Sequence, residues 1–231
     1  SVRLWKKNHP NFPCFLYCDK LTYNLLKDIN VLKLWDEVIL YSHDLNINRK
    51  VFWACNKVNV LNKQTEPCII LDHDSLVYKP IDEYLNDEVL VAHLELGEGY
   101  YPTNYDENIR NLSYNYHWET NSVNVSFLYF PKIDFLKTYT SLSLKIMEEF
   151  TNMNVPNSQY LIFSEQLLLK HLLDKHKVKY KSLITNYWDC NKWDWGESHS
   201  KGIWKYPESN LYYQHYGPLK NVIINDSNRY K

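Results

Sequence analysis

Short apolar runs alternate with segments whose apolar residues recur at helical spacing along the first part of the chain. The runs are four to seven residues long and rich in β-branched and aromatic residues, as in strands, whereas the segments between them have the period of helices. This alternation favours an α/β fold in which helices flank a mostly parallel central sheet. In order, the pattern predicts a helix end over 1–9, a strand over 12–18, a helix over 21–34, a strand over 37–41, a helix over 49–61 and a strand over 68–72.

The regular alternation of predicted strands and helices ends after Pro80. A strand over 89–93 is followed by a long polar stretch, rich in Tyr and Asn, which we expect to cover the site and which has room for a helix. Further on, the pattern predicts a strand over 123–130, a helix over 134–152 begun by Asp134, a helix over 164–175 begun by Ser164, and a strand over 178–184. With no repeat or low-complexity linker, we expect a single domain over 1–231.

Two carboxylates follow the apolar run 68–71, which has the composition of a strand buried on both faces in the middle of a sheet. In extended backbone, Asp72 and Asp74 point to the same side and His73 points away. Paired carboxylates repel each other unless a cation lies between them, and Mg²⁺ or Mn²⁺ bridging a phosphate is the natural choice. The alternative is a strand that simply ends in an Asp-rich turn.

A second group of candidate residues lies near the end of the chain, where His215, Gly217 and Lys220 follow one another within a few positions. An imidazole can bind a metal, a glycine allows close approach of the backbone, and a lysine supplies a point charge for phosphate. Together these residues predict a clamp for a cation and a diphosphate. The alternative is a surface histidine with no ligand.

Charged and aromatic residues elsewhere add candidates for binding and catalysis. Lys50 and Lys57 lie two turns apart on one face of the predicted helix 49–61, where they bind donor phosphates or form a solvated face. Glu165 opens a predicted helix and is either a catalytic carboxylate or a favourable partner of the helix dipole. The Trp-rich segment 188–204 either stacks on an acceptor sugar ring or packs into the core.

These motifs occur in an order that resembles the glycosyltransferases of the GT-A fold, most closely the family 8 type and its small viral and bacterial relatives. The resemblance spans about residues 12–220, and it is the combination of D-x-D with a distant H-x-G-x-x-K that makes it specific. The motifs are Asp72-His73-Asp74, the segment 124–130 (NVSFLYF), Glu165-Gln166, the segment 183–186 (LITN) and the segment 215–220 (HYGPLK).

The resemblance implies a GT-A (Rossmann-like) domain that transfers a sugar from a nucleoside-diphosphate sugar, most simply a UDP-sugar, to a carbohydrate or other hydroxyl acceptor. It also implies that the first strand of that fold would precede Ser1, so that the chain would be part of a longer protein. The implied roles are Mn²⁺ or Mg²⁺ on Asp72, Asp74 and His215; donor binding by Lys50, Lys57, Asp72, His73, Asn124, Gly217 and Lys220; acceptor binding by Gln166, Trp188 and Trp193; and catalysis by Glu165 with Asp189 behind it as candidate bases.

Composition narrows the class of protein further. The net charge of −1, with both signs dispersed, gives no footprint for nucleic acid, and no apolar run approaches the roughly 20 residues of a membrane span. Five cysteines without C-x-x-C spacing favour buried thiols in a reducing compartment, so we expect a cytoplasmic protein.

Two other functions fit parts of the pattern. The run before Asp72 also resembles the nucleophile strand of haloacid-dehalogenase phosphatases, in which Asp72 would attack phosphorus and Asp74 would be the acid/base. That family needs a downstream Gly-Asp pair, and the chain has no Gly-Asp dipeptide. The second alternative is a catalytically inert sugar-binding module, which would bind sugars without any dependence on metal.

Overall fold

The computed structural model describes residues 2–42, 44–96, 106–116 and 121–183, together with the backbone of two short strands at 188–189 and 213–215. The helices of this part are α1 (Val2–Asn8), α2 (Lys20–Asp28), α3 (Cys55–Lys63), α4 (Glu107–Arg110), α5 (Ile133–Asn152), α6 (Gln159–Ile162) and α7 (Leu168–Lys175). Its strands are β1 (Phe15–Cys18), β2 (Glu37–Leu40), β3 (Cys68–Leu71), β4 (Ser75–Val77), β5 (Val89–Val91), β6 (Leu94–Leu96), β7 (Asn121–Val123), β8 (Phe127–Phe130), β9 (Tyr180–Ser182), β10 (Trp188–Asp189) and β11 (Tyr213–His215).

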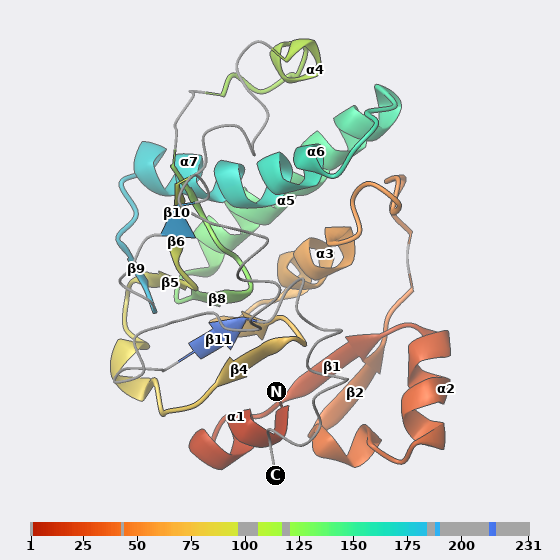
Figure 1. The fold of residues 1–231 in the computed structure, drawn as a ribbon, viewed down its shortest axis with the longest axis vertical. Helices are drawn as coiled ribbons and strands as arrows, with labels where there is room; N and C mark the ends of the chain where they lie inside the picture. Colours follow the sequence, from red (N-terminus) through yellow and green to blue (C-terminus); the bar gives the residue numbers. More distant parts are fainter. Residues whose placement is uncertain are drawn as a thin grey trace.

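The central sheet has four strands in the order β3-β8-β5-β9, and it is mixed (Figure 1). β8 runs antiparallel to both β3 and β5, and only β5 and β9 are parallel. The expected α/β class is therefore confirmed, but the expectation of a mostly parallel central sheet is wrong. An apolar run indicates that a strand packs against the core and says nothing about its direction, which depends on the path of the connecting chain.

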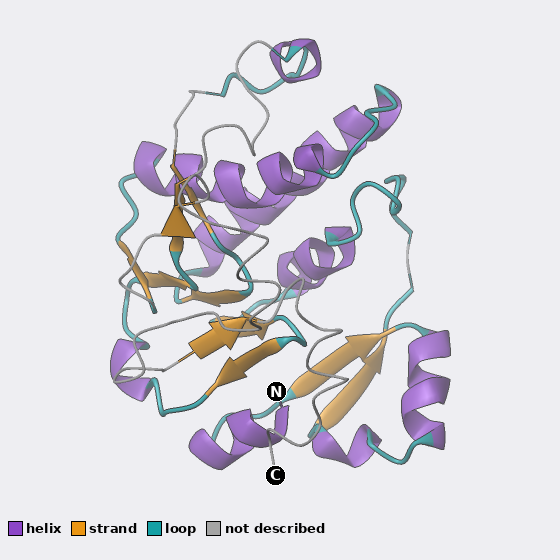
Figure 2. Ribbon diagram, viewed as in Figure 1, coloured by secondary structure: helices purple, strands orange, loops and turns teal. Residues whose placement is uncertain are grey.

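Three smaller sheets complete the fold, and Figure 2 shows the parallel pair β1-β2 apart from the other strands. The strand predicted over 123–130 is interrupted: β7 ends at Val123, β8 begins at Phe127, and residues 124–126 between them belong to neither strand. β7 instead pairs with β6, and β4 pairs with β11. These breaks in the ladders lie where the candidate site is built.

β3 lies at the edge of the four-stranded sheet rather than in its middle. Its four residues are all half-buried, whereas Phe127, Leu128 and Phe130 of β8 have no exposed surface. The expectation that the strand before Asp72 is buried on both faces is therefore wrong. Apolar composition alone does not distinguish an edge strand that is partly covered by neighbouring elements from a central strand.

The sheet separates two groups of buried side chains, because successive residues of a strand point to opposite faces. Val91 and Leu128 face the larger group, which α3, α5, α6 and α7 cover. Leu90 and Phe127 face a smaller group that includes Trp5 of α1. In Figure 1 the long helix α5 lies above the sheet, with α1 and β4 below it.

Several helix ends differ from those that the sequence predicts. The segment 49–54 forms turns, and α3 begins only at Cys55. The helix expected over 21–34 is divided into α2, whose N-terminus is capped by Asp19, and a 3₁₀ turn over Leu32–Leu34. Asp134 is not an N-cap but lies in the first turn of α5, where its charge favours the helix dipole.

Ser164 does not begin a helix either, because α6, a π-helical turn over Phe163–Leu167 and α7 follow one another without a break. The Ser164 hydroxyl donates a hydrogen bond to the carbonyl of Tyr160, four residues earlier, at 2.6 Å. A serine inside a helix commonly makes this bond, so the residue type favours a cap without requiring one. The polar stretch before β7 does contain a helix, the short α4.

Among the described residues, no helix is long and apolar enough to span a membrane.

Substitution of Phe150 in α5 tests the packing of the larger group of buried side chains. The ring of Phe150 is fully buried, stacks on Phe52 with centroids 6.3 Å apart and meets the edge of Phe163. We expect Phe150→Ala to lower the free energy of unfolding by about 3–5 kcal/mol, because it leaves a cavity between α5, the turns before α3 and the π-helical turn. The control Leu21→Ala, at a side chain 79% exposed, should change it by no more than about 0.5 kcal/mol in urea unfolding. Equal effects of the two substitutions would contradict this packing.

Candidate active site

The two carboxylates of the D-x-D motif stand at the end of β3, where the chain turns into β4. The amide of Asp72 donates to the carbonyl of Ser126 at 2.9 Å, and the amide of Ser75 donates back to the carbonyl of Asp72 at 2.9 Å. The backbone is thus a turn over residues 72–75, and the expectation of extended alternation between Asp72 and Asp74 is wrong. The alternative that the sequence left open, an Asp-rich turn after a strand, describes the backbone correctly.

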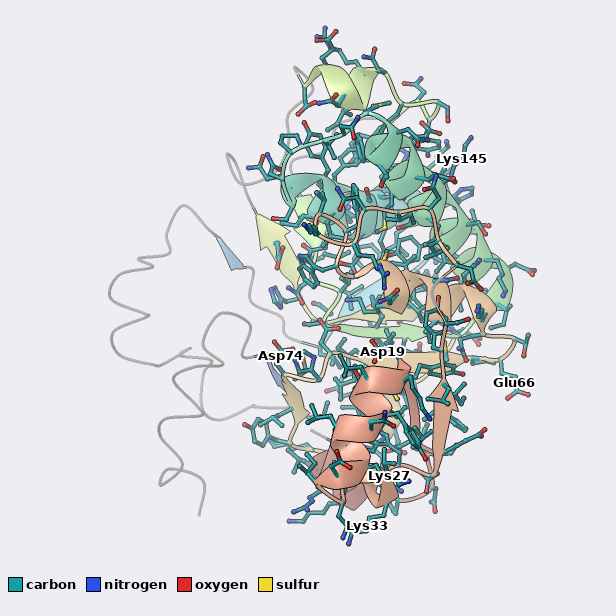
Figure 3. The ribbon with its side chains drawn as sticks, turned by 90° about the vertical axis from the view of Figure 1, so that its right-hand side faces the viewer. Asp19, Lys27, Lys33, Glu66, Asp74 and Lys145 are labelled. Atoms are coloured by element: carbon teal, nitrogen blue, oxygen red, sulfur yellow. The ribbon has the colours of Figure 1, made fainter. Side chains whose placement is uncertain are left out.

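The turn leaves the three side chains in different surroundings. Asp72 and Asp74 are half-buried, and His73 is exposed. Figure 3 shows Asp74 on the flank of the molecule away from Glu66 and Lys145. The carboxylate of Asp72 is fixed by an ion pair with Lys57, its Oδ1 lying 3.2 Å from the ammonium.

Lys57 reaches Asp72 from the first turn of α3, and its side chain is mostly buried. The same ammonium lies 2.7 Å from Oε1 of Glu165 and donates to the carbonyl of Val125 at 3.3 Å. The helix α3, the end of β3, the segment before β8 and the π-helical turn therefore converge on one cation. Lys50, predicted on the same helix face, is instead exposed in the turn before α3.

Glu165 is buried, with 3% of its surface exposed, inside the π-helical turn. A π-helical turn changes the backbone hydrogen bonds of a helix, and two hydroxyls of α5 bond to its carbonyls. Tyr139 donates to the carbonyl of Glu165 at 3.2 Å, and Ser143 donates to the carbonyl of Ser164 at 2.7 Å. The turn that presents Glu165 is thus held by the longest helix of the fold. Gln166 beside it is half-buried.

Burial and charge act on this group in opposite directions. Burial alone would lower the pKa of Lys57, but the charges of Asp72 and Glu165 outweigh it and hold that pKa above its ordinary value. Burial raises the pKa of Glu165, and the nearby ammonium offsets only part of that increase. Lys57 is therefore charged at neutral pH. Its ammonium pairs with the carboxylates of Asp72 and Glu165, and Asp74 lies in the same turn as Asp72. Carboxylate oxygens are the ligands that a divalent cation prefers.

A second polar group is buried beside the first. Asn124 donates from Nδ2 to Oε1 of Glu95 at 2.7 Å and accepts at Oδ1 from the amide of Ser126 at 3.0 Å. His93 lies 3.3 Å from the same carboxylate oxygen. The sequence predicts Asn124 as a site residue but not Glu95 or His93. One feature of the sequence could have indicated Glu95: it is an acidic residue between two leucines, shortly after an apolar strand.

The pairing of short strands brings two distant segments of the chain to this region. β11 runs antiparallel to β4 with His215 opposite Ser75, the residue that follows Asp74. β10 runs parallel to β6 with Trp188 opposite Glu95 and Asp189 opposite Leu96. The structure therefore joins the backbones of the D-x-D and H-x-G-x-x-K motifs.

Other candidates lie beyond what the structure describes. The side chains of Trp188, Asp189 and His215, and all of Trp193, Gly217 and Lys220, are outside the described residues. Within the described part, no cluster of three or more His, Cys, Asp or Glu side chains has the geometry of a metal site.

Lys57→Met tests the ion pairs in the metal-free protein. Removing the ammonium leaves Glu165 buried without its partner, so we expect a loss of about 3–5 kcal/mol in the free energy of unfolding at pH 8. Removal of the ammonium also raises the pKa of Glu165 further in the folded state. Because a carboxyl with a raised pKa binds more protons when folded, the variant should be relatively more stable near pH 5 and lose that stability as pH rises.

Urea unfolding at the two pH values, with a chelator present, measures the effect. Lys145→Met is the matched control, since Lys145 is 60% exposed on α5 and pairs only across one turn with Glu149 (Figure 3). It should cost no more than about 0.5 kcal/mol at either pH. An effect of Lys57→Met no larger than the control, or one that does not vary with pH, would contradict the arrangement.

Comparison with known proteins places the chain in a family but assigns no activity. No curated protein matches it. The family model described as "Family of unknown function (DUF6734)" matches residues 1–221, which is nearly the whole chain. The chain therefore belongs to the DUF6734 family.

Proposed function

We propose that this protein is a metal-dependent glycosyltransferase of the GT-A type, which moves a sugar from a nucleoside-diphosphate sugar, most simply a UDP-sugar, to a hydroxyl of a carbohydrate acceptor. The observation that carries the proposal is the pairing of β11 with β4. It brings together two motifs about 140 positions apart, each of which is weak by itself.

The proposed metal site consists of Asp72, Asp74 and His215. Carboxylate and imidazole ligands suit Mn²⁺, and carboxylates suit Mg²⁺. The donor set fits the surroundings, because His215 stands in register with Ser75 next to Asp74, and the nearby ammonium of Lys57 is already paired with Asp72 and Glu165. A divalent ion there would stabilise the negative charge that develops on a leaving diphosphate.

The residues of the chain would bind and orient the donor around that ion. Lys57, held between two carboxylates, presents a fixed positive charge toward a phosphate or a sugar hydroxyl. Lys220 would add a second positive charge on the diphosphate, with Gly217 allowing close approach. Asn124, fixed by Glu95 and Ser126, would hydrogen-bond the donor sugar. His73 remains a proposed donor contact, whereas the position of Lys50 gives it no support.

Glu165 acts through Lys57 in this proposal, as a positioning residue. Its carboxylate is almost wholly buried and directed at the ammonium, a geometry that suits the orientation of Lys57 better than the removal of a proton from an acceptor. Asp189 then becomes the first candidate for the base, if one is needed. Gln166, Trp188 and Trp193 remain proposed acceptor contacts, the tryptophans through stacking on a sugar ring.

The two alternatives make different predictions. A phosphatase with Asp72 as nucleophile would release phosphate from a phosphoester, and the ion pair with Lys57 is compatible with that chemistry. An inert sugar-binding module would bind sugars equally well with and without a divalent ion. Neither alternative accounts for the pairing that brings His215 beside the D-x-D motif.

Calorimetric titration of UDP and of GDP, each with and without Mn²⁺, tests the transferase directly. We expect one nucleotide to bind only with the metal, and Asp74→Asn to weaken that binding at least about tenfold by removing a charged ligand. Glu66→Gln is the matched control, because Glu66 is exposed on the opposite flank (Figure 3). Absence of metal-dependent binding of either nucleotide would overturn the proposal, and phosphate release from a phosphoester would favour the phosphatase.

Glu165→Gln separates positioning from proton transfer. If Glu165 orients Lys57, the variant should raise KM for the donor more than it lowers kcat, and the pH profile of kcat should keep its shape. Steady-state kinetics of donor hydrolysis, with the nucleotide identified by calorimetry, gives both quantities. A fall in kcat of about a hundredfold or more, with KM unchanged and the basic arm of the profile lost, would identify Glu165 as the base.

A further inference from the structure

A groove of about 700 Å³ lies at the end of the central sheet where β8 ends and β5 and β9 begin. A cavity of this size matches the range of small-molecule sites. It contains none of the site residues discussed above. Its lining comes from the turn before β5, the start of α5 and the segment between α7 and β9.

The strand register places the groove at the opposite end of the sheet from the D-x-D motif. Asp72 follows Leu71, which pairs with Phe127 at the beginning of β8. Pro131, which lines the groove, follows Phe130 at the far end of the same strand, opposite Cys68. A strand of four residues separates the two ends by about 13 Å, so the groove is distinct from the candidate active site.

The groove is strongly basic in a chain whose net charge is −1. Four exposed lysines and two acids line it, and one of the acids, Glu88, is already paired with Lys181 at 2.5 Å. The three remaining lysines are Lys132, Lys177 and Lys179. Against the single acid that is left, Asp87, they give the groove an excess of positive charge.

The rest of the lining adds to this character. Lys132 is the N-cap residue of α5, with no side-chain capping bond, so the positive end of a helix of 20 residues opens beside the lysines. Phe135 forms an apolar part of the lining, and the ring of His176 meets it edge-on with centroids 6.4 Å apart. Separate lysines around a partly apolar hollow, with helix amides at one end, suit phosphate groups carried on a small organic body.

We propose that this groove is a second binding site, which takes a small, multiply charged anion that carries phosphate groups. The proposal does not depend on glycosyl transfer. A phosphorylated metabolite and the phosphate-bearing end of a longer molecule offer the same chemistry to the lysines.

Calorimetric titration with tripolyphosphate, in the presence of a chelator, tests the proposal on the unmodified protein. We expect saturable binding with a stoichiometry near one, weaker at higher ionic strength because charge dominates it. A parallel titration with inorganic phosphate shows whether one phosphate is enough or several are needed, which separates a single phosphate group from an extended oligophosphate. Absence of saturable binding of either anion would overturn the proposal.

The variant Lys132→Glu/Lys179→Glu reverses two charges in the groove, and Lys27→Glu/Lys33→Glu makes the same change of charge on α2 and the 3₁₀ turn after it (Figure 3). We expect the groove variant to bind tripolyphosphate at least about tenfold more weakly and the control to change affinity by less than about twofold. Thermal unfolding should show that both variants are folded.

Asp74→Asn distinguishes this site from the candidate active site, because it should leave tripolyphosphate binding unchanged. Equal weakening by the two lysine variants would reveal non-specific attraction to the surface and overturn the proposal. A change of tripolyphosphate affinity in Asp74→Asn, with none in the groove variant, would assign the anion to the D-x-D region and overturn it as well. A protein that binds no nucleotide but behaves as expected here would retain the groove and lose only the transferase function.

Discussion

The ammonium of Lys57 connects the parts of the fold that build the candidate site. It lies between Asp72 at the end of β3 and Glu165 in the π-helical turn, and it also contacts the carbonyl of Val125 before β8. A buried charge is costly unless it is paired and hydrogen-bonded, so each partner fixes the position of the others. These ion pairs and this hydrogen bond therefore link α3, the central sheet and the π-helical turn.

The position of these contacts depends on the strand β8, which is the common neighbour of β3 and β5. Just before β8 the chain leaves the ladder, and this irregular segment carries Asn124 and the carbonyls that receive the Asp72 amide and the Lys57 ammonium. Breaks in regular structure free polar groups for other uses, as the π-helical turn also does at Glu165. The candidate site thus lies where two ladders and one helix are interrupted.

The two ends of the sheet differ in charge. At one end Lys57 lies between the carboxylates of Asp72 and Glu165, with Asp74 in the turn that follows Asp72, and the other end opens into the groove lined by Lys132, Lys177 and Lys179. A net charge close to zero for the whole chain is compatible with this local separation of charges. The proposed cation and the proposed anionic ligand would therefore bind at opposite ends of the sheet.

Apolar periodicity in the sequence determined the α/β class, most strands and the long helix α5, because burial of those side chains dominates local structure. The motifs and the places of charged residues in the predicted elements also identified Asp72, Lys57 and Glu165 as candidate site residues. Only the tertiary structure decided the mixed direction of the sheet, the edge position of β3, the turn over residues 72–75 and the burial of Glu95. Strand direction, and the partner that a buried charge finds, depend on contacts between residues far apart in the chain, which a local pattern does not encode.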